Sequence, residues 1–218
     1  MNAREKNLIP KSAEIGLDAV FTPSFYFAGE NLFSPEHKAR LFTMIRNPVD
    51  RTIAEYYTFI QSASEDALRE MSLEEFIESE HYQTNWFTAF VAGKFDEPLT
   101  DPYLQSAKEL LRTKYIIGVH DNIYGSIELF EDYFFWRSEG SRILKKCRRK
   151  NMKGEFNRNF AIYHKVGHRI RQNSTLYQII VGKNQLDMEL YWHGVELHRA
   201  QRFWIPKQYP TKIIPLKI

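Results

Sequence analysis

The sequence predicts an α/β fold in which a parallel sheet is flanked by helices. Two short apolar segments, residues 40–45 and residues 115–119, have the composition of buried strands. Each is followed at once by residues that can begin a helix. The order strand, helix, strand, helix is typical of parallel sheets, because the connection between two parallel strands usually crosses the sheet as a helix. The part of the chain after Arg158 is predicted to be mainly helical.

The first elements lead up to the stronger of the two strands. Residues 1–39 are predicted to form an irregular N-terminal segment, in which residues 17–22 are a weak candidate strand. After the strand of residues 40–45, Asn47 is placed as the N-cap of a helix over residues 48–61. The first helical residue is a proline, whose missing N–H costs nothing there. One apolar face of this helix is formed by residues at helical spacing, namely Val49, Ile53, Tyr56, Tyr57 and Ile60.

Three further helices are predicted before the second strand. Residues 72–79 begin with Ser72 followed three positions later by Glu75, which is the capping-box pattern. Residues 82–92 are expected to be helical as well. Asp101, with a proline directly after it, is expected to cap a helix that extends to about residue 113.

The second strand and the C-terminal part complete the predicted fold. Asp121 or Asn122 is expected to cap a helix that follows residues 115–119 and extends to about Arg137. The tail of residues 206–218 contains two further prolines among β-branched residues and is predicted to be extended. At 218 residues, of which 43% are hydrophobic, the chain is long enough for one core, and we expect a single domain over residues 1–218.

Arg46 stands at the carboxyl end of the first strand, directly before a helix N-terminus. An anion at this place meets the guanidinium group, backbone N–H groups of the first helical turn and the positive end of the helix dipole. The sequence therefore predicts an anion site at Arg46.

The residues around Arg46 also carry a family resemblance. Their pattern, Arg-x-Pro-x-x-Arg-x-x-x-x-Tyr after an apolar strand, resembles the 3′-phosphate-binding element of the sulfotransferases. These enzymes move a sulfuryl group from 3′-phosphoadenosine 5′-phosphosulfate to a hydroxyl or amine. The family's usual pattern is Arg-x-Pro-x-x-Arg-x-x-Ser-x-Tyr, in which the first Arg and the Ser hold the 3′-phosphate. Arg46, Pro48, Arg51 and Tyr56 match it, whereas Ala54 stands at the Ser position.

Further segments agree with the family in order and spacing. Residues 85–93 are similar to its Asn-x-x-Thr-x-x-x-x-Gly helix end, and residues 108–119 to a helix and strand that follow. Residues 122–136 resemble the next helix, and residues 184–191 resemble the Asn-x-x-Asp-x-x-Leu-Tyr start of the last helix. The likeness extends over residues 41–202 and is closest to the carbohydrate-type, Golgi-associated branch.

This resemblance implies a P-loop NTPase-like sulfotransferase fold and a sulfuryl transfer to a hydroxyl on a carbohydrate, in the Golgi lumen. It implies that the donor is 3′-phosphoadenosine 5′-phosphosulfate and that Arg46 and Arg51 bind it. It further implies an anionic or neutral glycan as the acceptor, and no metal. The family's 5′-phosphosulfate loop has no counterpart before Arg46, so the domain is either N-terminally incomplete or lacks that loop. The sequence assigns no catalytic base. The alternative is an inactive or truncated relative that acts as an anion- or glycan-binding module.

Composition and charge give weaker indications. The single cysteine excludes an internal disulfide. The sequence has no signal peptide and no apolar stretch of about 18 residues, so the chain is expected to be soluble and to lack a membrane span. The net charge is +3, but residues 142–158 hold eight Lys and Arg against one Glu, a local charge of +7. This basic run is either a solvated surface segment or a site for a glycan, for phosphates or for nucleic acid. Since few aromatics interleave with it, a nucleic-acid partner is not expected.

Overall fold

The computed structural model describes residues 19–22, 25–33, 40–136, 146, 166, 170 and 174–206. The chain divides into two compact units, residues 1–41 and residues 42–218. In the first unit the structure describes one helix, α1 (Phe25–Leu32), which the sequence analysis did not predict. The described part of the weak candidate strand, residues 19–22, is not in a strand, so that prediction is wrong for these residues.

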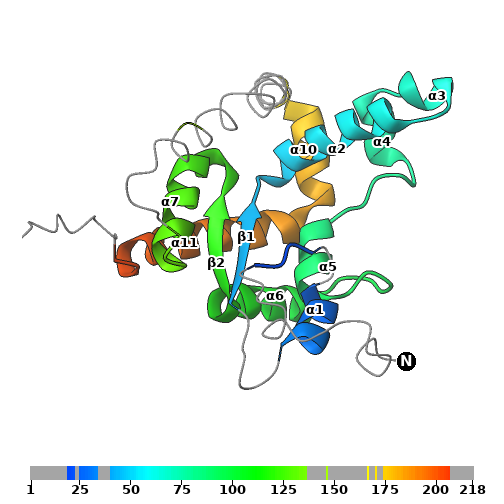
Figure 1. Ribbon diagram of the computed structural model, residues 1–218. Helices are drawn as coiled ribbons and strands as arrows, with labels where there is room; N and C mark the ends of the chain where they lie inside the picture. Colours follow the sequence, from blue (N-terminus) through cyan, green and yellow to red (C-terminus); the bar gives the residue numbers. More distant parts are fainter. Residues whose placement is uncertain are drawn as a thin grey trace, which may run out of the picture. The chain divides into compact units, whose positions relative to one another are not determined.

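A two-stranded parallel sheet confirms the predicted α/β class. The strands are β1 (Leu41–Ile45) and β2 (Tyr115–Val119), which are hydrogen-bonded neighbours. Figure 1 shows both arrows pointing the same way, with helices on either side. Both strands lie where the apolar runs of the sequence place them, within one residue.

The helix after β1 is α2 (Pro48–Ser62), and it begins as predicted. The side chain of Asn47 accepts the N–H of Val49 at 2.9 Å. The short helix α3 (Asp66–Arg69) was not predicted, whereas α4 (Leu73–Glu78) has the predicted capping box between Ser72 and Glu75. The apolar faces of α2, α4 and α10 (Ser174–Lys183) enclose a core whose least exposed members are Val49, Ile53, Phe76, Ile77 and Ile180.

Two helices before β2 begin at residues other than the predicted ones. The helix expected over residues 82–92 is α5 (Trp86–Ala92), and it begins late because Asn85 has a left-handed backbone, with φ at 51°. α6 (Asp101–Lys114) includes Asp101 within the helix, while Thr100 occupies the N-cap position.

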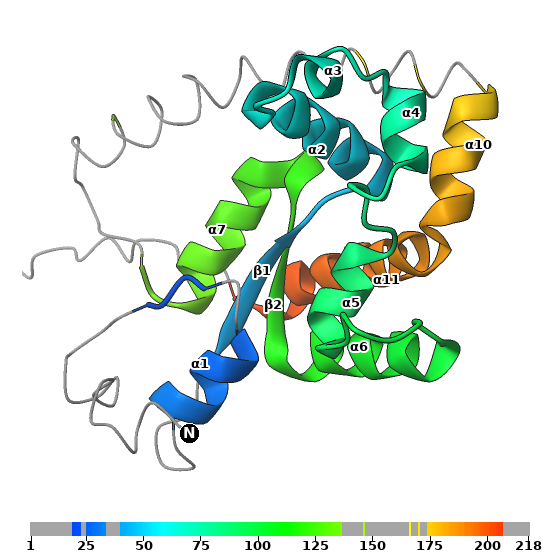
Figure 2. The same cartoon turned by 90° about the vertical axis from the view of Figure 1, so that its right-hand side faces the viewer.

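After β2 the chain forms the 3₁₀ turn η1 (His120–Asn122) and then α7 (Ile123–Tyr133), which is four residues shorter than predicted. The last helix is α11 (Gln185–Trp204). α11 packs along β2 and against α5 and α6, and Figure 2 shows α5 beside it. In the part of the chain that the structure describes, no helix is long and apolar enough to cross a membrane.

Side chains close the edge of β2 that faces away from β1. Residues 115, 117 and 119 direct their backbone N–H and C=O groups to one edge, because these groups alternate along a strand. The N–H of Ile117 donates to Oε1 of Gln201, and Nε2 of Gln201 donates to the carbonyl of Tyr115, both at 2.8 Å. Nδ1 of His198 lies 2.8 Å from the carbonyl of Ile117.

Ser126 of α7 completes this closed edge. Its hydroxyl accepts the N–H of Val119 at 2.8 Å and lies 3.0 Å from the carbonyl of the same residue. Ser126 and His198 are buried. β2 is therefore an edge strand whose outer backbone groups are satisfied without a further strand, so any extension of the sheet would have to be at β1.

Gln201→Ala is expected to lower the free energy of unfolding by about 1–3 kcal/mol, because two backbone groups of β2 would lose their partner. Chemical denaturation measures the change. Gln105→Ala on the exposed side of α6 is the matched control and is expected to stay within about 0.5 kcal/mol of the wild type. Equal effects of the two substitutions would show that the side-chain closure of β2 contributes nothing to stability.

Candidate functional site

The carboxyl ends of β1 and β2 bring Arg46 and His120 to one edge of the sheet. Arg46 directly follows β1, and His120 directly follows β2. Because the two strands are parallel neighbours, their carboxyl ends emerge side by side, which is where open α/β sheets bind ligands. Both side chains are half-buried.

The electrostatics of this edge link the two residues. Burial lowers the pKa of His120, and the positive charge of Arg46 lowers it further. Asp121 and Asp50 act in the opposite direction on the same imidazole. The carboxyl edge therefore carries charges of both signs around a histidine whose pKa is lowered from its ordinary value.

The start of α2 and part of α11 complete the carboxyl edge. α2 begins two residues after Arg46, so the positive end of its dipole lies at the same edge. From α11, the buried Tyr191 donates a hydrogen bond from its hydroxyl to Oδ2 of Asp121, at 3.2 Å. This bond ties the turn after β2 to the last helix.

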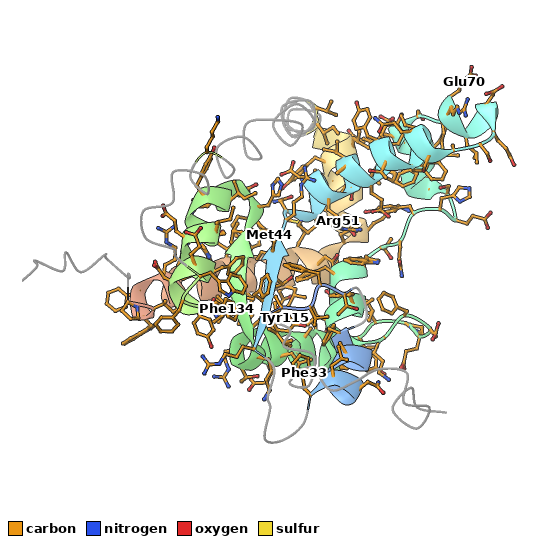
Figure 3. All side chains as sticks on the ribbon, in the orientation of Figure 1. Phe33, Met44, Arg51, Glu70, Tyr115 and Phe134 are labelled. Atoms are coloured by element: carbon orange, nitrogen blue, oxygen red, sulfur yellow. The ribbon has the colours of Figure 1, made fainter. Side chains whose placement is uncertain are left out.

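Arg51, the second predicted cofactor-binding residue, is held by contacts within the protein. Its Nη1 donates to Glu55 at 2.8 Å, and its Nη2 lies 3.3 Å from both the carbonyl of Gln83 and Oδ1 of Asn184. Figure 3 shows Arg51 between α2 and the start of α11. The structure thus links Arg46 to His120, and it links Arg51 to a separate polar network. The assignment of these arginines to a nucleotide stays a prediction.

The centre of that network is a reciprocal capping arrangement between α5 and α11. Asp187, in the first turn of α11, accepts the N–H of Phe87 at 3.0 Å and both the N–H and the hydroxyl of Thr88 at 2.7 Å. In return, Oδ1 of Asn85, at the start of α5, accepts the N–H of Asp187 at 3.1 Å. Each helix N-terminus is therefore satisfied by a side chain of the other.

Asn184 connects this reciprocal cap to α2. Its Oδ1 accepts the N–H of Asn85 at 3.1 Å, and its Nδ2 donates to the hydroxyl of Tyr82 at 2.6 Å. The Tyr82 hydroxyl in turn lies 2.7 Å from that of Thr52 on α2. Thr52 also donates to the carbonyl of Pro48, so this buried threonine does not supply the hydroxyl that is missing at Ala54.

Burial dominates the titration of two groups in this network. It raises the pKa of Glu55, against the lowering effect of the Arg51 charge. It also raises the pKa of Tyr82, although the hydrogen bonds of its hydroxyl with Thr52 and Asn184 act the other way. Tyr82 therefore remains a protonated hydroxyl that can donate to Thr52 while it accepts from Asn184.

The sequence analysis did not select His120 or Tyr191 as site residues. The available signal for His120 was its position directly after the second strand, which matches that of Arg46 after the first. The basic run of residues 142–158 lies outside the described residues except for Lys146, whose side chain is exposed.

Comparison with known proteins adds no relative, because no protein-family model, no curated protein and no solved structure matches the chain. Within the residues that the structure describes, no group of three or more His, Cys, Asp or Glu side chains could hold a metal ion.

Asp187→Ala is expected to lower the free energy of unfolding by about 3 kcal/mol, since the N–H of Phe87 and the buried N–H and hydroxyl of Thr88 would lose a charged acceptor. Glu189→Ala, two residues further along α11, removes an exposed ion pair with Lys108 and is expected to cost less than about 1 kcal/mol. Urea denaturation of both variants measures the difference. A similar small loss for both would contradict the reciprocal cap as a main stabilising element.

The pKa of His120, followed by NMR titration of its ring proton, is expected to lie below the ordinary histidine value and to rise in Arg46→Ala. The rise is expected to be partial, because burial is the larger cause. Arg112→Ala on the exposed side of α6 is the control and should leave the titration unchanged. Identical curves for wild type and Arg46→Ala would show that Arg46 does not act on this edge.

The sign of the linked stability change follows from the same shift. The unfolded chain binds the His120 proton more tightly than the folded protein does, so acid favours unfolding. This contribution to stability is therefore complete above the unfolded histidine pKa of about 6.5 and is lost as the pH falls from there toward the lowered folded pKa. His198, whose pKa burial also lowers, contributes with the same sign.

Proposed function

We propose that the chain is a sulfotransferase-type domain that binds the adenosine 3′,5′-bisphosphate part of 3′-phosphoadenosine 5′-phosphosulfate and serves sulfuryl transfer to a carbohydrate hydroxyl. The observation that carries the proposal is the position of Arg46 between the end of β1 and the capped start of α2. A guanidinium there can form two parallel hydrogen bonds to a phosphate, which the helix dipole also favours.

The second support is the convergence of the motif residues. Asn85 and Thr88 come from one family-like segment, and Asn184 and Asp187 come from another about a hundred residues later. In the folded protein these residues hydrogen-bond directly to each other, and Arg51 of the phosphate-element pattern joins them through Asn184. Residues that match a family only by chance are not expected to meet in one network. Their contact supports a P-loop NTPase-like sulfotransferase fold as part of this proposal.

Within the proposed site the two arginines have different tasks. Arg46 binds the 3′-phosphate directly. Arg51 acts by holding α2 against the α10–α11 junction, because its Nη atoms already contact Glu55, Gln83 and Asn184. The position of α2 in turn sets the backbone that faces the phosphate next to Arg46.

A non-catalytic anion- or glycan-binding module is the alternative function. It is favoured by Ala54, which replaces the hydroxyl donor of the family pattern and is not compensated by the buried Thr52. The acidic side chains of Asp50 and Asp121 act on the same edge and reduce its attraction for a multiply charged nucleotide. A singly charged sulfate ester would be repelled less.

Arg46→Ala is expected to weaken binding of adenosine 3′,5′-bisphosphate by about 10- to 100-fold, which corresponds to the loss of charged hydrogen bonds. Isothermal titration calorimetry measures the affinity. Arg112→Ala is the matched control for overall charge, because Arg112 is exposed on α6 and paired with Glu109; it is expected to keep the wild-type affinity.

A sulfated oligosaccharide without nucleotide separates the two functions. Binding of the nucleotide that depends on Arg46 supports the sulfotransferase-type site, and transfer of labelled sulfuryl from the donor would establish catalysis. Binding of the oligosaccharide alone supports the non-catalytic module. If the wild-type chain binds neither compound, both functions are excluded for the Arg46 edge.

A further inference from the structure

The start of α2 offers few hydrogen-bond donors to a phosphate at Arg46. Pro48 has no N–H, and the N–H of Val49 already donates to the N-cap side chain at 2.9 Å. One turn further on, the hydroxyl of Thr52 donates to the carbonyl of Pro48, and Ala54 has no polar side-chain atom. A phosphate has three strongly accepting oxygens. Its binding beside Arg46 therefore requires a donor from another element.

His120 is in the position to provide this donor. It directly follows β2, as Arg46 directly follows β1, and the two strands are hydrogen-bonded neighbours. Figure 1 shows their arrowheads at the same end of the sheet. Adjacent strands lie about 4.8 Å apart, so the two residues leave the sheet side by side. Both are half-buried, which leaves part of each side chain accessible to a ligand.

The charges that act on His120 come from several elements. Arg46 lies after β1, Asp50 is in the first turn of α2, and Asp121 is the next residue in η1. From α11, the hydroxyl of Tyr191 donates to Asp121 and holds that carboxylate in place. These groups are one cation and two carboxylates. A ligand with two negative charges is therefore attracted here more strongly when the imidazole is protonated.

We propose that His120 is a second binding residue for the nucleotide 3′-phosphate at the Arg46 edge, and that it takes up a proton when this phosphate binds. The protonated imidazole donates to a phosphate oxygen in a charge-assisted hydrogen bond. The inference rests on the proposed function, from which it takes the nucleotide as the ligand.

The electrostatics of the edge support the uptake of a proton. In the free protein, burial and the charge of Arg46 lower the pKa of His120, so the imidazole gives up its proton readily. A bound phosphate brings two negative charges, which outweigh the single positive charge of Arg46 and raise the pKa of His120. The proton also offsets the repulsion that Asp50 and Asp121 exert on the ligand. A sulfate ester, with one negative charge, would promote less protonation.

Isothermal titration calorimetry with adenosine 3′,5′-bisphosphate, in two buffers of different ionisation enthalpy, measures the proton uptake. At about pH 7.5 the free phosphate is already a dianion, because its second pKa is about 6, so the proton goes to the protein. We expect the wild type to take up at most about one proton per bound nucleotide. Its affinity is expected to rise as the pH falls from about 8.5 to 7, by no more than about tenfold per pH unit, because the bound state holds the extra proton.

His120→Gln is the decisive variant, because glutamine keeps an N–H donor but takes up no proton. Proton uptake is expected to be lost, and the affinity at about pH 7 is expected to fall about tenfold with the loss of a charged hydrogen bond. His81→Gln is the matched control, since His81 is exposed and contacts the ring of Phe59 near the other end of α2. It is expected to keep the wild-type affinity and proton uptake.

The role of His120 is overturned if the nucleotide binds through Arg46 without proton uptake, or if His120→Gln takes up the proton as the wild type does. In both cases the proposed function stands. Equal uptake with adenosine 5′-monophosphate, which lacks the 3′-phosphate, also overturns it. If the wild type does not bind the nucleotide, the proposed function and this inference are both wrong. Should His120→Gln not fold, NMR titration of the wild-type His120 ring decides, because its pKa is expected to rise when the nucleotide is bound and an unchanged pKa contradicts the inference.

Discussion

The reciprocal cap between Asn85 and Asp187 is the constraint on which much of the larger unit depends. It fixes the starts of α5 and α11 against each other through bonds of 2.7 to 3.1 Å. α11 is also the helix that closes the outer edge of β2 and reaches Asp121 through Tyr191. A shift of α11 by one residue would therefore break the cap, the edge closure and the tie to the carboxyl edge together. Helix register and site geometry are set by the same contacts.

Close packing of α11 against the sheet reinforces this register. A Cβ atom at Gly194 would lie 2.5 Å from Cδ1 of Ile45, the last residue of β1, so a larger residue at this position would force the Ile45 side chain or the helix to shift. On β2, Gly118 instead allows a close approach of α7, because a Cβ there would lie 2.7 Å from the ring of Phe130. Arg46 is the next residue after Ile45, so this packing lies directly beside the predicted anion site.

The sequence predicted what local patterns determine and missed what depends on distant contacts. Both strands, the Asn47 cap and the Ser72 capping box were found because their signals lie within a few residues. The start of α5 was misplaced because the left-handed Asn85 is stabilised by partners about a hundred residues away. The end of α7 was placed too late because a phenylalanine takes a conformation expected of glycine. Arg46 could be selected from sequence, but its neighbour His120 follows from strand pairing.

Helix geometry explains why Arg46 and Arg51, five positions apart, have different surroundings. Arg46 precedes α2, whereas Arg51 is the fourth residue within it, so its side chain leaves the helix about one turn after the start. From there it reaches Asn184 and Glu55, and it cannot share the surroundings of His120 without breaking those bonds. In the proposed function, a phosphate at the carboxyl edge would contact the first turn of α2. The Arg51 contacts would hold α2 in place, so the second arginine would support binding at the first without touching the ligand.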